Sequence, residues 1–272
     1  MTDTVPDRAE ITALLSDQWD ALTRLVDGLD ETGWRTASAL PGWTVFDVLA
    51  HVIGTESILL GEPVPDLDVS GAHIRNDIGT LNEKWIASLR PLTGSQLLER
   101  FLEVTGRRLK ALEQTTPETW AELVPTPVGM APYGRFMRIR LFDCWMHEHD
   151  IADGLGVSVD EGGARGAAAA AELLPALGRA AVKGAGAPDG SRLTLDITGP
   201  VPQQLHIAVD GGRANLVETL DAPATVVITL DSRLFARLRG GRTTADEHAG
   251  EITVTGDTDL GDRLVRCLAF TI

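Results

Sequence analysis

Cysteine is scarce in this sequence of 272 residues, which contains only Cys144 and Cys267. No two cysteines are separated by two residues, so the sequence argues against a cysteine zinc site and against a disulfide scaffold. Cys144 directly follows Asp143, but neighbouring side chains on a helix point about 100° apart. We therefore interpret Cys144 as a buried apolar thiol rather than as a nucleophile.

Basic residues are also few, with 24 Lys and Arg against 39 Asp and Glu, which gives a net charge of -15. Nucleic acid and anionic membranes would be repelled by this charge, so neither is expected as a partner. No apolar run approaches the roughly 18 residues of a membrane span, and the first seven residues lack the features of a signal peptide. We expect a cytoplasmic protein that acts on small molecules.

The sequence shows no internal repeat and no convincing phosphate-binding loop. Its glycine-rich segments, such as Gly240-Gly241, do not follow a strand, so we do not expect nucleotide binding. Hydrophobic residues make up 43% of the chain, enough for substantial cores. The length favours two domains.

Apolar residues recur at helical intervals throughout the first 155 residues, as in the series Ile11, Leu14, Leu15, Trp19 and Leu22. Thr44 is a candidate N-cap, with Asp47 in the position of a capping-box acid. The pattern predicts helices over residues 7–29, 45–60, 78–89, 94–113 and 133–155. Four main helices of this kind favour an antiparallel bundle, in which metal sites form from inward-facing side chains.

The pattern changes in the second half of the chain. An alanine- and glycine-rich segment contains a predicted helix over 164–182. Period-two alternation then predicts strands near 193–197, 205–209, 226–230 and 252–254, with a hairpin turn at 210–212 and helices over 232–239 and 259–268. We predict an α+β fold with an antiparallel C-terminal sheet, divided into a bundle over 1–158, a helical linker over 159–189 and a smaller domain over 190–272.

Three residues form a candidate metal site. Asp143 and His147 are four residues apart, about one helical turn, so both project from one face. His51 lies among apolar residues of another predicted helix and is a candidate third ligand. Two imidazoles and one carboxylate leave coordination positions open, which suits a reactive metal. The alternatives are chance spacing on a surface helix and a buried His51 that bonds to a neighbouring helix.

The other polar residues near this pair compete poorly for the same ion. His149 is about 200° around the helix from His147, so we expect it to be exposed or to lie outside the ligand set. Glu148 and Asp150 either orient ligands or are solvated. The remaining histidines lack a partner at metal spacing and are interpreted as structural or surface residues; they are His73, His206 and His248.

Residues 40–51 (LPGWTVFDVLAH) and 140–151 (RLFDCWMHEHDI) resemble the DinB-like fold of the mycothiol-dependent maleylpyruvate isomerase family, and the resemblance extends over the whole chain. It implies a metal-binding four-helix bundle followed by a smaller domain related to sterol carrier proteins. The family's metal ligands map onto His51, Asp143 and His147, although the family has Glu where this chain has Asp143. A family Gly-Arg, whose arginine faces the active site, best matches Arg242.

An arginine at this place can hold a substrate carboxylate through two parallel hydrogen bonds. Arg237 and Arg239 lie nearby, and a solvated basic run is the alternative. The family resemblance implies a divalent metal such as Zn²⁺ with mycothiol as thiol cosubstrate, and S-transferase or isomerase activity on a small electrophile. A metal-water hydrolase on the same three ligands and a non-catalytic protein that binds a small apolar ligand remain alternatives. No oligomeric state is predicted.

Overall fold

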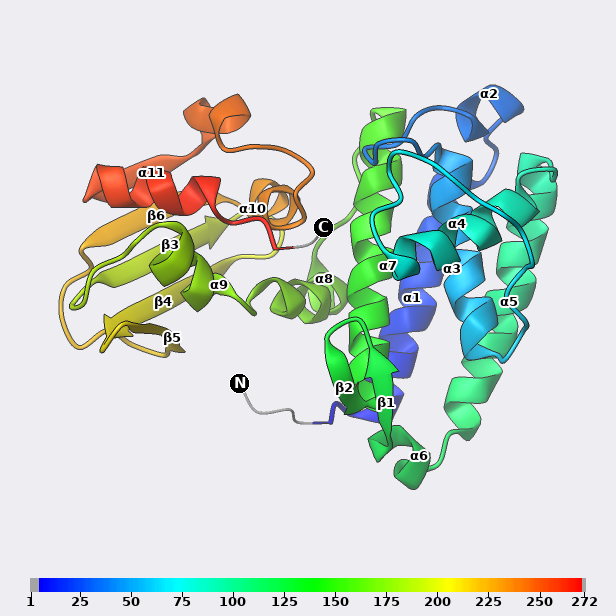
Figure 1. The fold of residues 1–272 in the computed structure, drawn as a ribbon, viewed down its shortest axis with the longest axis horizontal. Coiled ribbons are helices and arrows are strands. Elements are labelled where there is room, and N and C mark those ends of the chain that lie inside the picture. Colours follow the sequence, from blue (N-terminus) through cyan, green and yellow to red (C-terminus); the bar gives the residue numbers. More distant parts are fainter. Residues whose placement is uncertain (1–4, 271–272) are drawn as a thin grey trace. The chain divides into compact units, whose positions relative to one another are not determined.

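The computed structural model describes residues 5–270 and divides the chain after Val159 into two compact units. The N-terminal unit is mostly helical (Figure 1). Its elements are α1 (Arg8–Val26), α2 (Glu31–Trp34), α3 (Val45–Leu59), α4 (Asp77–Leu89), α5 (Gly94–Gln114), α6 (Pro117–Ala121), β1 (Leu123–Thr126), β2 (Gly129–Pro132) and α7 (Tyr133–Leu155).

Four long helices, α1, α3, α5 and α7, form the predicted bundle. Each of α1 and α3 packs against both α5 and α7, and α4 lies against α3. The five helices predicted from periodicity are confirmed to within three residues at either end. Periodic apolar residues explain this agreement, because they occupy the core: Ile11, Leu15, Leu22, Leu49, Ile53, Leu97, Phe101 and Leu141 are all at most 3% exposed.

The start of α3 is fixed by the capping box expected from the sequence. Thr44 accepts a hydrogen bond from the Asp47 backbone N–H, and the Asp47 side chain accepts one from the Thr44 backbone N–H. The shorter Asp thus replaces the usual Glu. Asp47 also accepts a hydrogen bond from the Arg90 guanidinium at 2.9 Å, which anchors the end of α4 to the start of α3.

The longest helix, α7, buries an unusual number of polar side chains. Arg140, His147, Glu148 and Asp150 are each no more than 6% exposed. These buried polar groups need partners inside the bundle.

Within residues 5–270, no helix has the length and apolar character needed to cross a bilayer.

A short hairpin precedes α7. Strands β1 and β2 pair antiparallel, with Val124 opposite Ala131. Gly129 makes the reversal possible, because its φ of 101° lies in a region that other residues rarely adopt. Four-residue strands give too little alternation to be detected in a segment rich in proline and glycine.

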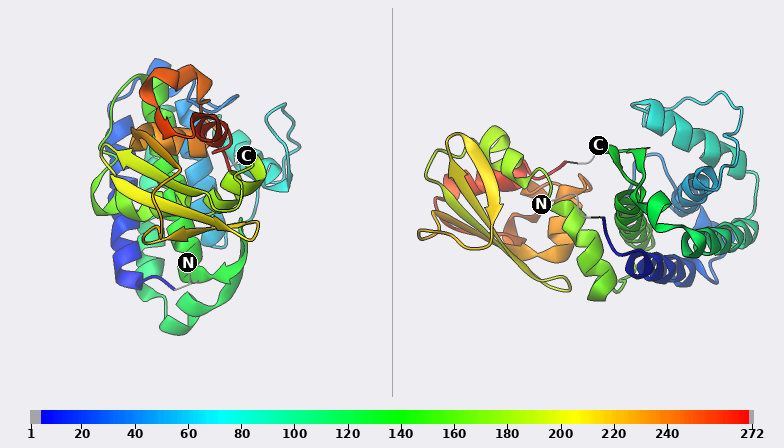
Figure 2. Two further views of the ribbon diagram at one scale, coloured as in Figure 1. Left: turned by 90° about the vertical axis from the view of Figure 1, so that its left-hand side faces the viewer. Right: turned by 90° about the horizontal axis from the view of Figure 1, so that it is seen from below.

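The C-terminal unit combines helices with one five-stranded sheet (Figures 1 and 2). Its elements are α8 (Gly163–Ala170), η1 (Ala171–Leu173), α9 (Leu177–Arg179), η2 (Ala180–Gly184), β3 (Arg192–Thr198), β4 (Gln203–Asp210), β5 (Arg213–Val217), β6 (Val226–Asp231), α10 (Ser232–Arg239), η3 (Asp246–Glu251), β7 (Thr253–Gly256) and α11 (Thr258–Arg266). The α+β class is confirmed. Of the linker expected over 159–189, residues 160–189 lie within this unit.

The strand order is β5-β4-β3-β6-β7. Inward-facing residues of the three central strands meet in register, with Leu195 opposite both Leu205 and Ile228. Helices α10 and α11 pack against this sheet and cover its apolar residues. This arrangement explains the period-two alternation seen in the sequence.

Two details of the predicted C-terminal fold are wrong. The sheet is mixed rather than antiparallel, because the chain leaves β5 at one side and returns as β6 beside β3, in the same direction as β3. The single helix over 164–182 is broken into short pieces. Pro175 interrupts it, and Ala176 adopts a left-handed conformation with φ 66°.

The contact between α3 and α4 yields a stability prediction. A Cβ atom at Gly54 would lie 2.5 Å from the Cβ of Trp85, whereas one at Gly106 in α5 would have no neighbour within 4 Å. We expect Gly54→Ala to destabilise the protein by about 1–3 kcal/mol through overpacking. Gly106→Ala, the matched control, should stabilise it by about 0.5–1 kcal/mol through helix propensity. Urea unfolding of both variants measures the difference, and equal effects would contradict this account of the packing.

Candidate metal centre

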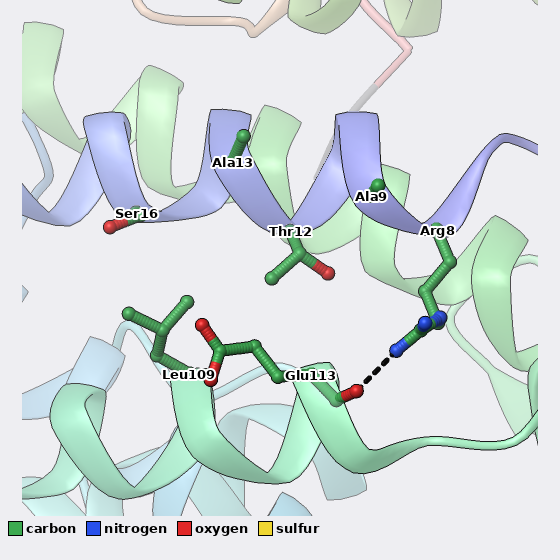
Figure 3. A pocket seen from close by; sticks show the side chains of 7 residues that line it. All are labelled: Arg8, Ala9, Thr12, Ala13, Ser16, Leu109 and Glu113. Atoms are coloured by element: carbon green, nitrogen blue, oxygen red, sulfur yellow. Dashed lines mark hydrogen bonds between the residues drawn. The ribbon is translucent and has the colours of Figure 1, made fainter.

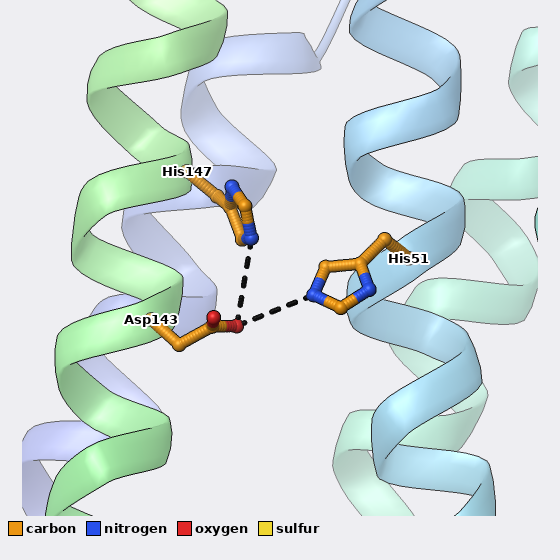
Figure 4. A group of neighbouring side chains, drawn as sticks. All are labelled: His51, Asp143 and His147. Atoms are coloured by element: carbon orange, nitrogen blue, oxygen red, sulfur yellow. Dashed lines mark hydrogen bonds and ion pairs between the residues drawn. The ribbon is translucent and has the colours of Figure 1, made fainter. Parts of the chain in front are cut away.

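Three side chains from two helices point toward one another inside the N-terminal bundle (Figure 4). The Oδ2 atom of Asp143 on α7 lies 3.4 Å from Nε2 of His51 on α3 and 3.5 Å from Nε2 of His147. One donor atom from each of the three residues lies within 4.8 Å of the others. The structure thus brings together the three residues that the sequence analysis selected.

The spacing of these donors fits a small metal ion. Bonds of about 2.0–2.1 Å in a tetrahedral site place neighbouring ligand atoms roughly 3.4 Å apart. The two distances from Asp143 Oδ2 are close to this value. The side chains of His51 and His147 are 8% exposed, whereas that of Asp143 is 33% exposed, so the cluster is accessible from the carboxylate side. Three protein donors also leave one position of a tetrahedral ion for an external ligand.

Asp150 orients one of the imidazoles. Its Oδ2 lies 3.0 Å from Nδ1 of His147, one helical turn away on α7, and its side chain is 1% exposed. A carboxylate that accepts from Nδ1–H leaves Nε2 with a free lone pair directed at the centre of the cluster. Ligating histidines commonly have such a partner. Asp150 is therefore an orienting residue rather than a solvated one.

His51 is buried and lies against an aromatic ring. Trp43, from the loop before α3, lies with its ring centroid 5.3 Å from that of His51. Burial lowers the pKa of His51, although Asp143 acts in the opposite direction. Its Nδ1 has no hydrogen-bond partner among the residues described. A neutral imidazole is the form that binds a metal.

Arg140 holds the carboxylate of Asp143. Its Nη1 donates to Asp143 Oδ2 at 2.6 Å, from one turn earlier on α7. Burial on its own would raise the pKa of Asp143, but His147, Arg140 and His51 together hold that pKa well below its usual range. Asp143 is thus ionised at neutral pH, as a ligand must be.

A second carboxylate balances the charge of Arg140. Glu56 on α3 is 1% exposed; it accepts from Arg140 Nε at 3.0 Å and from Arg108 Nε at 2.9 Å. Arg108 also donates to the Tyr133 hydroxyl. Arg108, Glu56, Arg140 and Asp143 therefore form a row of alternating charges, here called the buried charge row. Sequence reasoning missed it, although an acidic residue among the apolar residues of α3 was a usable signal.

The remaining histidines lie outside the cluster. His149 is only 1% exposed, with its ring centroid 4.2 Å from that of Trp145, so of the two expected placements it is not exposed but lies outside the ligand set. The other three bond to one or two polar side chains: His73 to Glu83, His206 to Thr194, and His248 to both Glu251 and Thr243. Their interpretation as structural or surface residues fits these contacts.

The arginines near the end of α10 differ in their surroundings. Arg239 is fully buried and donates to the backbone carbonyls of Leu173, Pro175 and Leu268, while burial lowers its pKa to about 10. It therefore acts as a structural clamp. Arg242 is half-buried, in the turn after α10, and its guanidinium donates to the carbonyl of Gly240 at 2.6 Å. Its role in substrate binding stays a prediction.

A shallow hollow between α1 and α5 is separate from the cluster (Figure 3). Its volume is about 380 Å³, and small residues of α1 form one wall. Arg8 crosses one end and donates to the backbone carbonyl of Glu113. The lining residues, Arg8, Ala9, Thr12, Ala13, Ser16, Leu109 and Glu113, include none of the three clustered donors.

The chain is similar to known proteins in sequence and in fold. Residues 15–152 match the family model described as the mycothiol maleylpyruvate isomerase N-terminal domain. The crystal structure of a mycothiol-dependent maleylpyruvate isomerase superposes with a TM-score of 0.60 at 20% identity, covering 94% of this chain and 95% of that one. A histidine-to-alanine mutant of that isomerase gives 0.58 at 18% identity, with the same coverage.

A ubiquinone synthesis protein, UbiJ-SCP2, matches 35% of this chain and 78% of its own at 20% identity, with a TM-score of 0.25. No curated protein matches the chain significantly. At 20% identity the match to the isomerase shows a shared fold, and it extends over both units of this chain.

The two cysteines should differ sharply in reactivity. Cys144 is fully buried, and burial raises the pKa of its thiol. The prediction that it is a buried thiol is confirmed. Cys267 is partly exposed and lines a hollow of about 430 Å³ in the C-terminal unit. We expect an aromatic disulfide reagent to modify only Cys267 in the native protein, and both thiols after unfolding. Cys267→Ser is the control, because Cys144 is then the one remaining thiol. Rapid modification of this variant in its folded state would contradict the burial of Cys144.

Proposed function

Because the chain belongs to the mycothiol maleylpyruvate isomerase N-terminal domain family, we propose that it is a metal-dependent enzyme that uses mycothiol to act on a small electrophilic substrate. The observation that carries this proposal is the cluster of His51, Asp143 and His147, whose donors have the spacing and the open side of a reactive metal site. S-transfer and thiol-assisted isomerisation are the reactions that such a site supports.

Each residue of the cluster has a defined task. Nε2 of His51, Nε2 of His147 and Oδ2 of Asp143 would hold a divalent ion, for which Zn²⁺ fits the mixed nitrogen and oxygen donors. The bound ion supplies Lewis-acid chemistry that favours the thiolate form of a thiol at neutral pH. Asp150 fixes the tautomer of His147, and Arg140 keeps Asp143 ionised.

The N-terminal unit offers no suitable thiol of its own among its described residues. Cys144 is next to Asp143 in sequence, but its sulfur is buried and lies 3.6 Å from Arg140 Nη2, and burial raises its pKa. It is therefore unsuited to attack an electrophile. An external thiol such as mycothiol would supply the nucleophile that the N-terminal unit lacks among its described residues.

Arg242 is our candidate for binding a substrate carboxylate. Its guanidinium is half-buried and donates to the carbonyl of Gly240, and guanidinium groups bind carboxylates in a bidentate manner. Arg239 is less suitable because its donors are committed to backbone carbonyls.

Metal content tests the ligand assignment. We expect about one equivalent of Zn²⁺ in the native protein and loss of most of it in His51→Ala and Asp143→Ala, since each change removes one of three protein ligands. His248→Ala is the matched control, because this imidazole lies in the C-terminal unit and bonds to Glu251. Elemental analysis after dialysis measures the difference. Equal metal content in native protein and Asp143→Ala would eliminate the proposed ligand set.

The thiol requirement separates the proposed reaction from hydrolysis. A model electrophile should be consumed only when metal-loaded protein and mycothiol are both present, with activity falling at least about 100-fold in His147→Ala. Cys144→Ala should keep its activity, because the protein thiol takes no part. Metal-dependent turnover without any thiol would instead favour a metal-water hydrolase. If the protein shows neither of these activities but binds an apolar ligand, it is a non-catalytic protein.

A further inference from the structure

The oxygen of Asp143 that faces both imidazoles also accepts a hydrogen bond from the guanidinium of Arg140. Arg140 Nη1 lies 2.6 Å from Asp143 Oδ2, and the two imidazole nitrogens lie 3.4 and 3.5 Å from the same atom. The guanidinium therefore cancels the single negative charge among the three donors, because the two imidazoles are neutral ligands.

Arg140 is held where it is. Its side chain is 4% exposed, it donates to Glu56 at 3.0 Å as well as to Asp143, and Glu56 is itself bonded to Arg108. Moving Arg140 away from Asp143 would leave a buried charge without one of its partners, which is costly. The cation is thus a fixed part of the surroundings of Asp143.

We propose that Arg140 is a positioning residue that neutralises Asp143 and so makes the site select a small anion, such as a thiolate, as its external ligand. This inference rests on the proposed metal site. With the charge of Asp143 offset, the positive charge of the ion remains available to the incoming ligand, and Coulomb attraction favours an anion over a neutral molecule.

The positive charge of Arg140 favours an anionic ligand but disfavours the metal ion. A fixed guanidinium next to the carboxylate repels a divalent cation and weakens Asp143 as a donor. Removal of the positive charge should therefore tighten metal binding and weaken anion binding. A residue with only a structural role would loosen both, because a disordered Asp143 binds metal less well and leaves a poorer site for any ligand.

Cobalt-substituted protein allows both affinities to be measured. Co²⁺ affinity is obtained by competition with a chelator, and ligand affinity from the visible spectrum during titration with thiocyanate, an anion, and with imidazole, a neutral ligand. For Arg140→Gln we expect Co²⁺ to bind on the order of tenfold more tightly, thiocyanate about tenfold more weakly and imidazole unchanged. Arg140→Lys keeps the charge and should remain near the native values.

Arg108→Gln is the matched control. It removes an equally buried guanidinium from the buried charge row but does not touch Asp143, so both affinities should stay within about twofold of the native protein. Glu56→Gln removes the carboxylate that offsets Arg140 and should act in the opposite direction, with weaker Co²⁺ binding and tighter thiocyanate binding. It also provides a test if Arg140→Gln fails to fold.

The outcomes distinguish the inference from the proposed function. Native protein that binds no Co²⁺ would overturn the metal site and the inference with it. Native protein that binds Co²⁺, with both affinities reduced or unchanged in Arg140→Gln, would overturn the role of Arg140 and leave the metal site standing. Opposite shifts for Co²⁺ and thiocyanate, with imidazole unchanged, support the inference.

Discussion

The carboxylate of Glu56 is the group on which the arrangement of the site depends. It extends from α3, is 1% exposed, and accepts hydrogen bonds from Arg108 on α5 and Arg140 on α7. A buried carboxylate without these partners would be strongly destabilising, so the three helices are constrained to bring them together. This constraint fixes which face of α7 is turned toward α3. Asp143 and His147 lie on that face and meet His51.

The cluster of candidate metal ligands could be predicted from the sequence because its geometry is largely local. Asp143 and His147 share a helix, and the apolar residues around His51 indicated that it points into the bundle. The periodicity that placed the helices also placed these side chains. His149 shows the limit of the same reasoning, since its angular distance from His147 was correct but its burial against Trp145 depends on a different part of the core.

Features that depend on partners distant in the sequence were not predictable in this way. Arg140 and Asp143 are one helical turn apart, a spacing that the sequence displays, yet the bond to Glu56 joins residues 84 positions apart. The parallel pairing of β3 with β6 has the same origin, because period two reveals strands but not their order. Pro175 is a helix breaker that the sequence displays, so the predicted helix over 164–182 should have ended before it.

The family resemblance of the sequence implies a glutamate where this chain has Asp143, and the structure shows how far the shorter acid reaches. Its Oδ2 already lies within 3.5 Å of both imidazole nitrogens, so the missing methylene leaves no gap to be closed. A shorter side chain also has one rotatable bond fewer to immobilise. Arg140, three residues earlier, fixes the remaining freedom. Aspartate held by arginine thus presents a carboxylate oxygen to both histidines, while the guanidinium offsets its charge.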